Sequence, residues 1–135
     1  MRESAGEDVR EALDDLRLRP GRAALVLEPD PDQQQRLARL LVLSGHRVVG
    51  TSTLDGGRSL LREFPVDVVL IAEELTLPSP MAVIADMVGL MPGARFVVLT
   101  QPEEPVSGIR PARYEALEYL ERPIEPARLR ELLAS

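Results

Sequence analysis

Between residues 22 and 133 the chain alternates short runs of consecutive apolar residues with longer segments in which apolar residues recur every three or four positions. Consecutive apolar positions are typical of strands buried on both faces of a parallel sheet, and the longer spacing is typical of helices with one buried face. The predicted strands are residues 23–27, 47–50, 66–72, 95–99 and 118–120. The predicted helices are one that carries Leu37 to Leu43 and ends at Gly45, and the segments 53–64, 78–91 and 126–133. This alternation predicts an α/β fold, a five-stranded parallel sheet with helices on both faces.

The segment between Thr100 and Tyr119 breaks the regular pattern at the place where another helix is expected. It contains three prolines and a glycine, namely Pro102, Pro105, Gly108 and Pro111. A proline inside a helix costs about 3 kcal/mol and a glycine about 1 kcal/mol. We therefore expect a loop first, and a short helix only from about residue 110 to residue 117.

Residues 1–21 form an extension that stands apart from the domain expected over residues 22–135. Val9, Leu13 and Leu16 are spaced by four and three positions among many acidic residues, and Pro20-Gly21 follows them. This spacing predicts a short amphipathic helix. The extension is either loosely docked and frayed, or a helix that binds a partner or a second copy of the chain.

The composition of the chain limits the kinds of binding partner and the cellular compartment that we expect. The chain has no cysteine, which excludes disulfides and thiolate metal sites. Its net charge of −6 opposes attraction to nucleic-acid phosphates and anionic lipid, so neither is an expected partner. No apolar stretch approaches the roughly 20 residues that cross a bilayer, and the N-terminus lacks a signal-peptide pattern. We expect a cytoplasmic protein.

The single histidine, His46, follows a helix and is expected to be a cap or surface residue rather than a catalyst.

Several polar residues fall where the predicted strands end. Glu28-Pro29 follows the first strand, Glu73-Glu74 follows the third strand at Ala72, Thr100 ends the fourth, and Tyr119-Leu-Glu-Arg-Pro123 covers the fifth. With the five βα units, this pattern resembles the receiver domain of bacterial two-component response regulators over residues 23–133. The resemblance implies a flavodoxin-like, doubly wound sheet of order 2-1-3-4-5, with the site at the carboxyl ends of the strands.

The resemblance places Ala72 at the position of the phosphoacceptor aspartate, whereas counting back from Pro78 would select Glu74 instead. Loops absorb insertions more easily than buried strands do, so we prefer Ala72. An alanine cannot act as a nucleophile. Glu73 and Glu74 are then either solvated loop acids or a permanent carboxylate that imitates a phosphoryl group.

The other site positions are only partly kept. Glu28 and Pro29 match the acidic pair that holds Mg²⁺, and the proline removes one ligand, so we expect no bound metal. Thr100 matches the hydroxyl residue, and Tyr119 matches the aromatic residue of the switch. Arg122 replaces the family's lysine and is expected to pair with Glu28, Glu73 or Glu74. The resemblance also implies a cis Arg122–Pro123 bond.

These losses indicate a degenerate, atypical receiver that is no enzyme and needs no cofactor. We expect a phosphorylation-independent protein-interaction module in bacterial signalling. Two alternatives remain: a conventional receiver that is phosphorylated on Glu74 or Glu73, and a receiver-like sensor of a small molecule. The expected contact face, for an acidic protein partner or a homodimer, consists of the irregular fourth helix, the fifth strand and the last helix. It carries Tyr119 and arginines that are either a positive patch or simply solvated, namely Arg110, Arg113, Arg122, Arg128 and Arg130.

Overall fold

The protein is built on one parallel sheet of five strands in the order β2-β1-β3-β4-β5. The structure, a computed structural model, describes residues 22–101 and 117–134. The strands are β1 (Ala23–Leu27), β2 (Arg47–Thr51), β3 (Val68–Ala72), β4 (Arg95–Thr100) and β5 (Glu118–Glu121). The fold class and the strand order are therefore the predicted ones, and each strand lies within about two residues of its predicted bounds.

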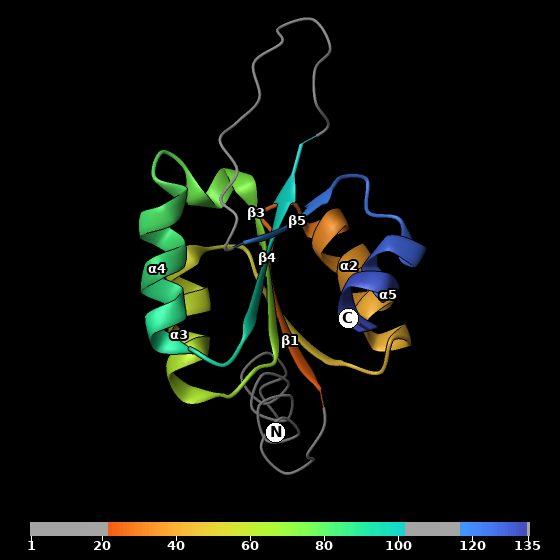
Figure 1. Ribbon diagram of the computed structural model, residues 1–135, viewed down its shortest axis with the longest axis horizontal. Helices are drawn as coiled ribbons and strands as arrows, with labels where there is room; N and C mark the ends of the chain where they lie inside the picture. Colours follow the sequence, from red (N-terminus) through yellow and green to blue (C-terminus); the bar gives the residue numbers. More distant parts are fainter. Residues whose placement is uncertain (1–21, 102–116, 135) are drawn as a thin grey trace, which may run out of the picture.

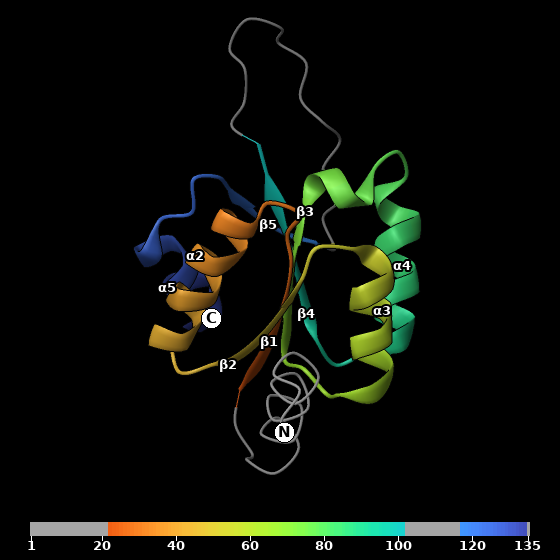
Figure 2. The same cartoon turned by 180° about the vertical axis from the view of Figure 1, so that it is seen from behind.

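Helices cover both faces of the sheet. Two of them, α2 (Pro31–Leu43) and α5 (Pro126–Ala134), lie on one face, and α3 (Leu54–Glu63) and α4 (Pro80–Leu90) lie on the other, as Figures 1 and 2 show from opposite sides. A short 3₁₀ helix that the sequence did not predict, η1 (Glu73–Thr76), follows β3. These elements put the carboxyl ends of all five strands at one edge of the molecule.

The inner strands are buried because nearly every residue in them is apolar. In β1, Leu25 and Leu27 pack in the apolar cluster under α3 and α4, whereas Ala24 and Val26 pack in the cluster under α2 and α5. Successive side chains point to opposite faces of a strand, so a strand with no polar position can only lie between two helical layers. The consecutive apolar runs therefore specified a central position in the sheet.

Local signals set the limits of α2. The Asp30 carboxylate caps its first turn by accepting a hydrogen bond from the Asp32 backbone N–H at 2.9 Å, and Pro31 follows the cap. At the other end Gly45 has a φ of 90°, which residues with a side chain rarely adopt. The turn after the helix therefore depends on this glycine.

His46 is buried, contrary to the expectation of a cap or surface residue. It begins the turn into β2, and its Nδ1 is buried without a hydrogen-bond partner among the described residues. Burial, with the nearby charge of Arg22, holds the pKa of His46 below its ordinary value of 6.5, although Asp67 and the Ser44 backbone act in the opposite direction. The position after a helix did not reveal that the turn folds inward against the sheet.

Several predictions lie outside the described residues. These are the N-terminal extension over residues 1–21, most of the short helix expected at about residues 110–117, and the two arginines Arg110 and Arg113. The Arg122–Pro123 bond is cis, as predicted, and the Leu77–Pro78 bond is cis as well. Among the residues that are described, no helix combines the length and the hydropathy that crossing a membrane requires.

Candidate functional site

The carboxyl edge of the sheet contains a hollow of about 350 Å³. Most of its lining residues come from the segments that follow β1, β3, β4 and β5, which meet here because parallel strands end at the same edge. The lining consists of Glu28, Pro29, Asp30, Gln33, Glu74, Gln101, Arg122 and Pro123. The site predicted from the sequence is thus assembled at its expected place, with some members exchanged.

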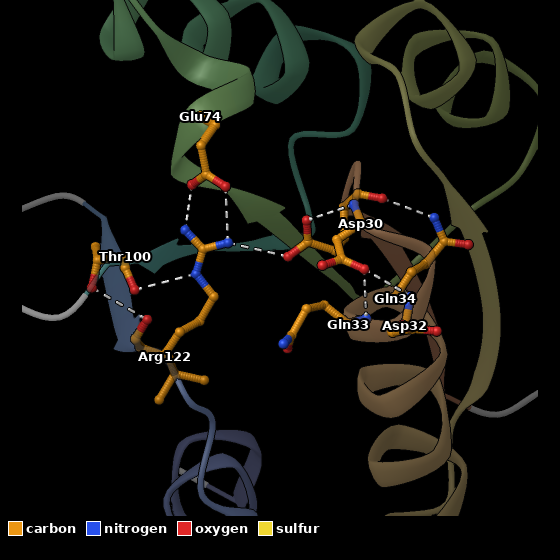
Figure 3. A network of polar contacts seen from close by, with 9 residues as sticks. Asp30, Asp32, Gln33, Gln34, Glu74, Thr100 and Arg122 are labelled. Carbon is orange, nitrogen blue, oxygen red and sulfur yellow. Dashed lines mark hydrogen bonds and ion pairs between the residues drawn. The ribbon is translucent and has the colours of Figure 1, made fainter.

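Arg122, which follows β5, connects to residues at the other three strand ends around the hollow (Figure 3). Its Nη1 donates to Glu28 Oε1 at 3.2 Å and to Glu74 Oε2 at 3.0 Å, and its Nη2 donates to Glu74 Oε1. Its Nε donates to the Thr100 carbonyl oxygen at 3.3 Å. We call Arg122, Glu28 and Glu74 the Arg122 clasp, because one guanidinium holds two carboxylates from different elements.

The clasp is largely shielded from water. The Glu28 side chain is 1% exposed and the Arg122 side chain 11%, whereas Glu74 is 40% exposed. A buried carboxylate needs a partner, because removing a charge from water without one is strongly unfavourable. Arg122 Nη1 supplies this partner to Glu28 Oε1 at 3.2 Å, and the Asp30 backbone N–H donates to Glu28 Oε2.

The surroundings of Arg122 and Glu74 favour the charged form of each side chain. For Arg122, burial opposes the charge, but the hydrogen bonds and charges of Glu74 and Glu28 outweigh it and raise the pKa. For Glu74, burial is likewise the opposing influence, and the hydrogen bonds to Arg122 and to the backbone, the charge of Arg122 and the neighbouring Gln101 together outweigh it, so the pKa lies below its ordinary value of 4.5. At neutral pH the clasp is an ion pair.

The residues around Glu28 do not fit a divalent cation. Glu28 Oε1 is bonded to Arg122, and Glu28 Oε2 accepts the backbone N–H of Asp30 at 3.2 Å. Pro29 has no side-chain oxygen, and Asp30 is engaged as the cap of α2. Across residues 22–101 and 117–134, no group of three or more His, Cys, Asp or Glu side chains has the geometry of a metal site. A fixed guanidinium stands beside the one buried carboxylate that could serve as a ligand.

Ala72 is the last residue of β3, fully buried and opposite Leu99 of β4. It does not line the hollow. The chain turns into η1 directly after it, and this turn brings Glu74 to Arg122, while the Glu73 carbonyl accepts a hydrogen bond from the Thr76 hydroxyl at 2.6 Å. Of the two glutamates that the sequence singled out, Glu74 enters the site and Glu73 does not line it.

Thr100 and Tyr119 lie next to the site rather than in it. The Thr100 hydroxyl is buried and donates to the Leu120 carbonyl oxygen at 3.4 Å, so it bridges β4 to β5. Tyr119 is half-buried and packs against the apolar cluster under α3 and α4. Neither side chain lines the hollow, whereas Pro123 does.

Of the arginines expected on the contact face, Arg122, Arg128 and Arg130 lie in the part that the structure describes. Arg122 turns inward to the clasp, although Arg128 and Arg130 of α5 are exposed as expected. Arg128 lines a second hollow, of about 280 Å³, together with the acidic residues Glu121 and Glu125. This surface is therefore mixed in charge.

Sequence reasoning missed two lining residues, Gln33 and Gln101, and left Asp30 in the loop. Gln101 follows β4 directly and helps to lower the pKa of the neighbouring Glu74, and Gln33 lies in the first turn of α2 next to the Asp30 cap. Their positions just beyond strand ends were the available signal. The resemblance pointed only to positions that have a role in receiver domains, and Gln33 and Gln101 are not among those positions.

Comparison with known proteins identifies the fold. No family model matches the chain, and no curated protein does. Among solved structures, a CheY-like response regulator receiver domain from Methylobacillus flagellatus is similar with a TM-score of 0.70 and 21% identity, over 84% of this chain and 96% of that one. The signal receiver domain of an HD domain-containing protein from Pseudomonas fluorescens Pf-5 gives 0.68 and 20%, over 84% and 92%.

A third similar structure carries the phosphorylated state. It is a response regulator from Burkholderia pseudomallei with a phosphorylated aspartic acid, a calcium ion and citrate, with a TM-score of 0.64 and 22% identity, over 80% of this chain and 64% of that one. At these identities the similarity establishes the receiver-domain fold, as the sequence resemblance predicted.

Proposed function

We propose that the chain is an atypical receiver that acts in signal transduction as a phosphorylation-independent protein-interaction module. The observation that carries the proposal is the Arg122 clasp. In a receiver the carboxyl edge responds to a covalent phosphoryl group, and here an internal ion pair holds the ends of β1, β4 and β5 to η1 without one. The clasp would keep this edge in one arrangement at all times.

Phosphorylation on a glutamate is the less favourable alternative. Both oxygens of Glu74 accept hydrogen bonds from Arg122, which lowers their nucleophilicity, and Glu73 does not line the hollow. Phosphoryl transfer also relies on cations that neutralise developing charge, and the residues around Glu28 do not fit a divalent cation. The similar Burkholderia protein, by contrast, has a phosphorylated aspartic acid and a calcium ion.

A small-molecule sensor is also less favourable. A vacant acceptor position would have to leave space above Ala72, and that side chain is fully buried and lines no described hollow. The hollow of about 350 Å³ lies beside the clasp, where Arg122 and Glu74 already satisfy one another.

A protein that docks on β5 and α5 is the expected partner. Arg128 and Arg130 are exposed there, and Glu121 and Glu125 lie beside Arg128. A surface of mixed charge favours a partner whose own charges alternate, since complementary potentials select partners more than they add affinity.

Intact-mass measurement after incubation with acetyl phosphate and Mg²⁺ tests the proposal, with a response regulator that has an acceptor aspartate as the positive control. We expect the positive control to gain one phosphoryl group and this chain to gain none. A gain that disappears in Glu74→Gln or Glu73→Gln would replace the proposal with the conventional mechanism.

A further inference from the structure

Exposed apolar side chains are concentrated on and beside α4. Among the described residues only five large apolar side chains are strongly exposed, and three of them are Leu77, Met81 and Val88. Leu77 is 61% exposed, Met81 39% and Val88 38%. Figures 1 and 2 show α4 at the outer flank of its helical layer, with α3 beside it.

Nearly all residues of α4 are apolar, on the outer side of the helix as well as on the side that faces the sheet. Ile84 and Met87 face the sheet, while Met81, Ala85 and Val88, spaced by four and three positions, share the outer face. Helices that are apolar all round are normally buried. The outer face of α4 therefore lacks the polar residues that water contact favours.

The few charges near this face are already neutralised within the chain. Asp86, the only charged residue of α4, lies 2.6 Å from Arg58 Nε of α3. Beside Val88 a hollow of about 370 Å³ is lined by Val88, Ala94, Arg95, Phe96, Leu117 and Glu118. The two charged residues of this lining, Arg95 and Glu118, are paired with each other at 3.0 Å.

We propose that the outer face of α4 is a self-association surface, on which a second copy of this chain packs its own α4 across a two-fold axis. A two-fold contact sets the same patch against itself, so any uncompensated charge would meet its like. This chain has a net charge of −6, and the surface beside α5 carries acids such as Glu121 and Glu125. The α4 face is apolar with its charges closed into internal pairs, so it can meet its own copy without that repulsion.

The outer face of α4 has projecting apolar side chains and, beside them, a hollow, and a two-fold contact sets the one against the other. Met81 and Val88 project from α4, and the hollow beside Val88 is lined partly by apolar side chains. One helix of three turns buries a small area, so the dimer is a weak one. This surface is separate from the clasp and from α5, and it borders the β5 and α5 face at Glu118, so it adds a contact that the proposed function does not use.

Crosslinking of single cysteines tests the location of the contact, because the chain has no cysteine of its own. Ala85 lies in the middle of the outer face of α4, and Ala127 is an alanine on α5 that is also exposed. Under mild oxidation of the full chain, Ala85→Cys is expected to form a disulfide-linked dimer much faster than Ala127→Cys. Equal rates, or faster crosslinking through Ala127→Cys, would overturn the proposal.

Sedimentation velocity over a range of concentrations gives the independent measurement. We expect the wild-type mass to rise with concentration toward a dimer, and Val88→Glu to weaken association at least about tenfold. Met81→Glu should act in the same way if Val88→Glu proves unstable. Leu43→Glu is the matched control, because Leu43 is 84% exposed at the end of α2 and should leave association unchanged. A monomer at every concentration, or a dimer weakened equally by all three changes, contradicts the proposal.

Discussion

At the scale of single residues, the site depends on how Arg122 differs from a lysine. A guanidinium presents several donors in a planar fork, and here that fork reaches Glu28, Glu74 and the Thr100 carbonyl oxygen at once. A compact ammonium group could not span these acceptors from one position. The guanidinium of Arg122 therefore holds the site together.

Removal of the guanidinium should destabilise the protein. In Arg122→Met the buried Glu28 carboxylate loses its charged partner, and we expect a loss of about 3 kcal/mol in the free energy of unfolding. The double variant Glu28→Gln/Arg122→Met should lose less than the sum of the two single changes, since the unpaired charge is gone. Urea denaturation measures the free energy of unfolding of both single variants and of the double variant. Arg128→Met, which removes an exposed arginine, should change stability by less than about 0.5 kcal/mol, and an equal effect of the two arginine changes would argue against the clasp.

His46 should make stability depend on pH below neutrality. Its folded-state pKa lies below 6.5, so as the pH falls the unfolded chain takes up the proton first and folding becomes less favourable. The slope for one group is at most about 1.4 kcal/mol per pH unit. Urea denaturation between pH 7.5 and 5.5 should show a steeper fall for wild type than for His46→Gln. Parallel curves would mean that His46 titrates alike in both states.

At the scale of elements, the sequence predicted what local patterns determine. The apolar runs located all five strands, and the helices end within a few residues of their signals, such as Gly45 after α2. The 3₁₀ helix η1 was not predictable, because Glu74 is held by Arg122, which lies 48 positions away in the chain. The burial of His46 likewise depends on contacts between distant segments, whereas the pairing of Arg122 with Glu28 and Glu74 was expected from the family resemblance.

The N-terminal cap of α2 gives a prediction at this scale. Asp30→Ala removes the side chain that accepts hydrogen bonds from the first turn, and we expect a loss of about 1 kcal/mol. Asp32→Ala is the matched control, since Asp32 is exposed in the same turn and donates its backbone N–H without being the cap. Thermal and urea unfolding should separate the two variants; equal losses would assign the effect to charge near the helix end rather than to capping.

At the scale of the whole molecule, the chain has the receiver-domain fold, with the Arg122 clasp at its carboxyl edge. The sheet order and the two helical layers are those of the similar receiver structures. At the carboxyl edge, the positively charged side chain of Arg122 lies beside the buried carboxylate of Glu28. We expect the guanidinium of Arg122 to take the place of a bound metal ion at this site. Added divalent cations should therefore not stabilise the folded protein.

Thermal unfolding in increasing MgCl₂, at ionic strength held constant with NaCl, tests this claim most directly. A cation that binds only the folded state would stabilise it by about 2.7 kcal/mol at one hundred times its dissociation constant, which corresponds to a rise of several degrees in Tm. The account predicts no saturable rise for the wild-type chain. A Tm that increases with Mg²⁺ and then saturates would show that the site takes up a metal in spite of Arg122, and would contradict the central claim.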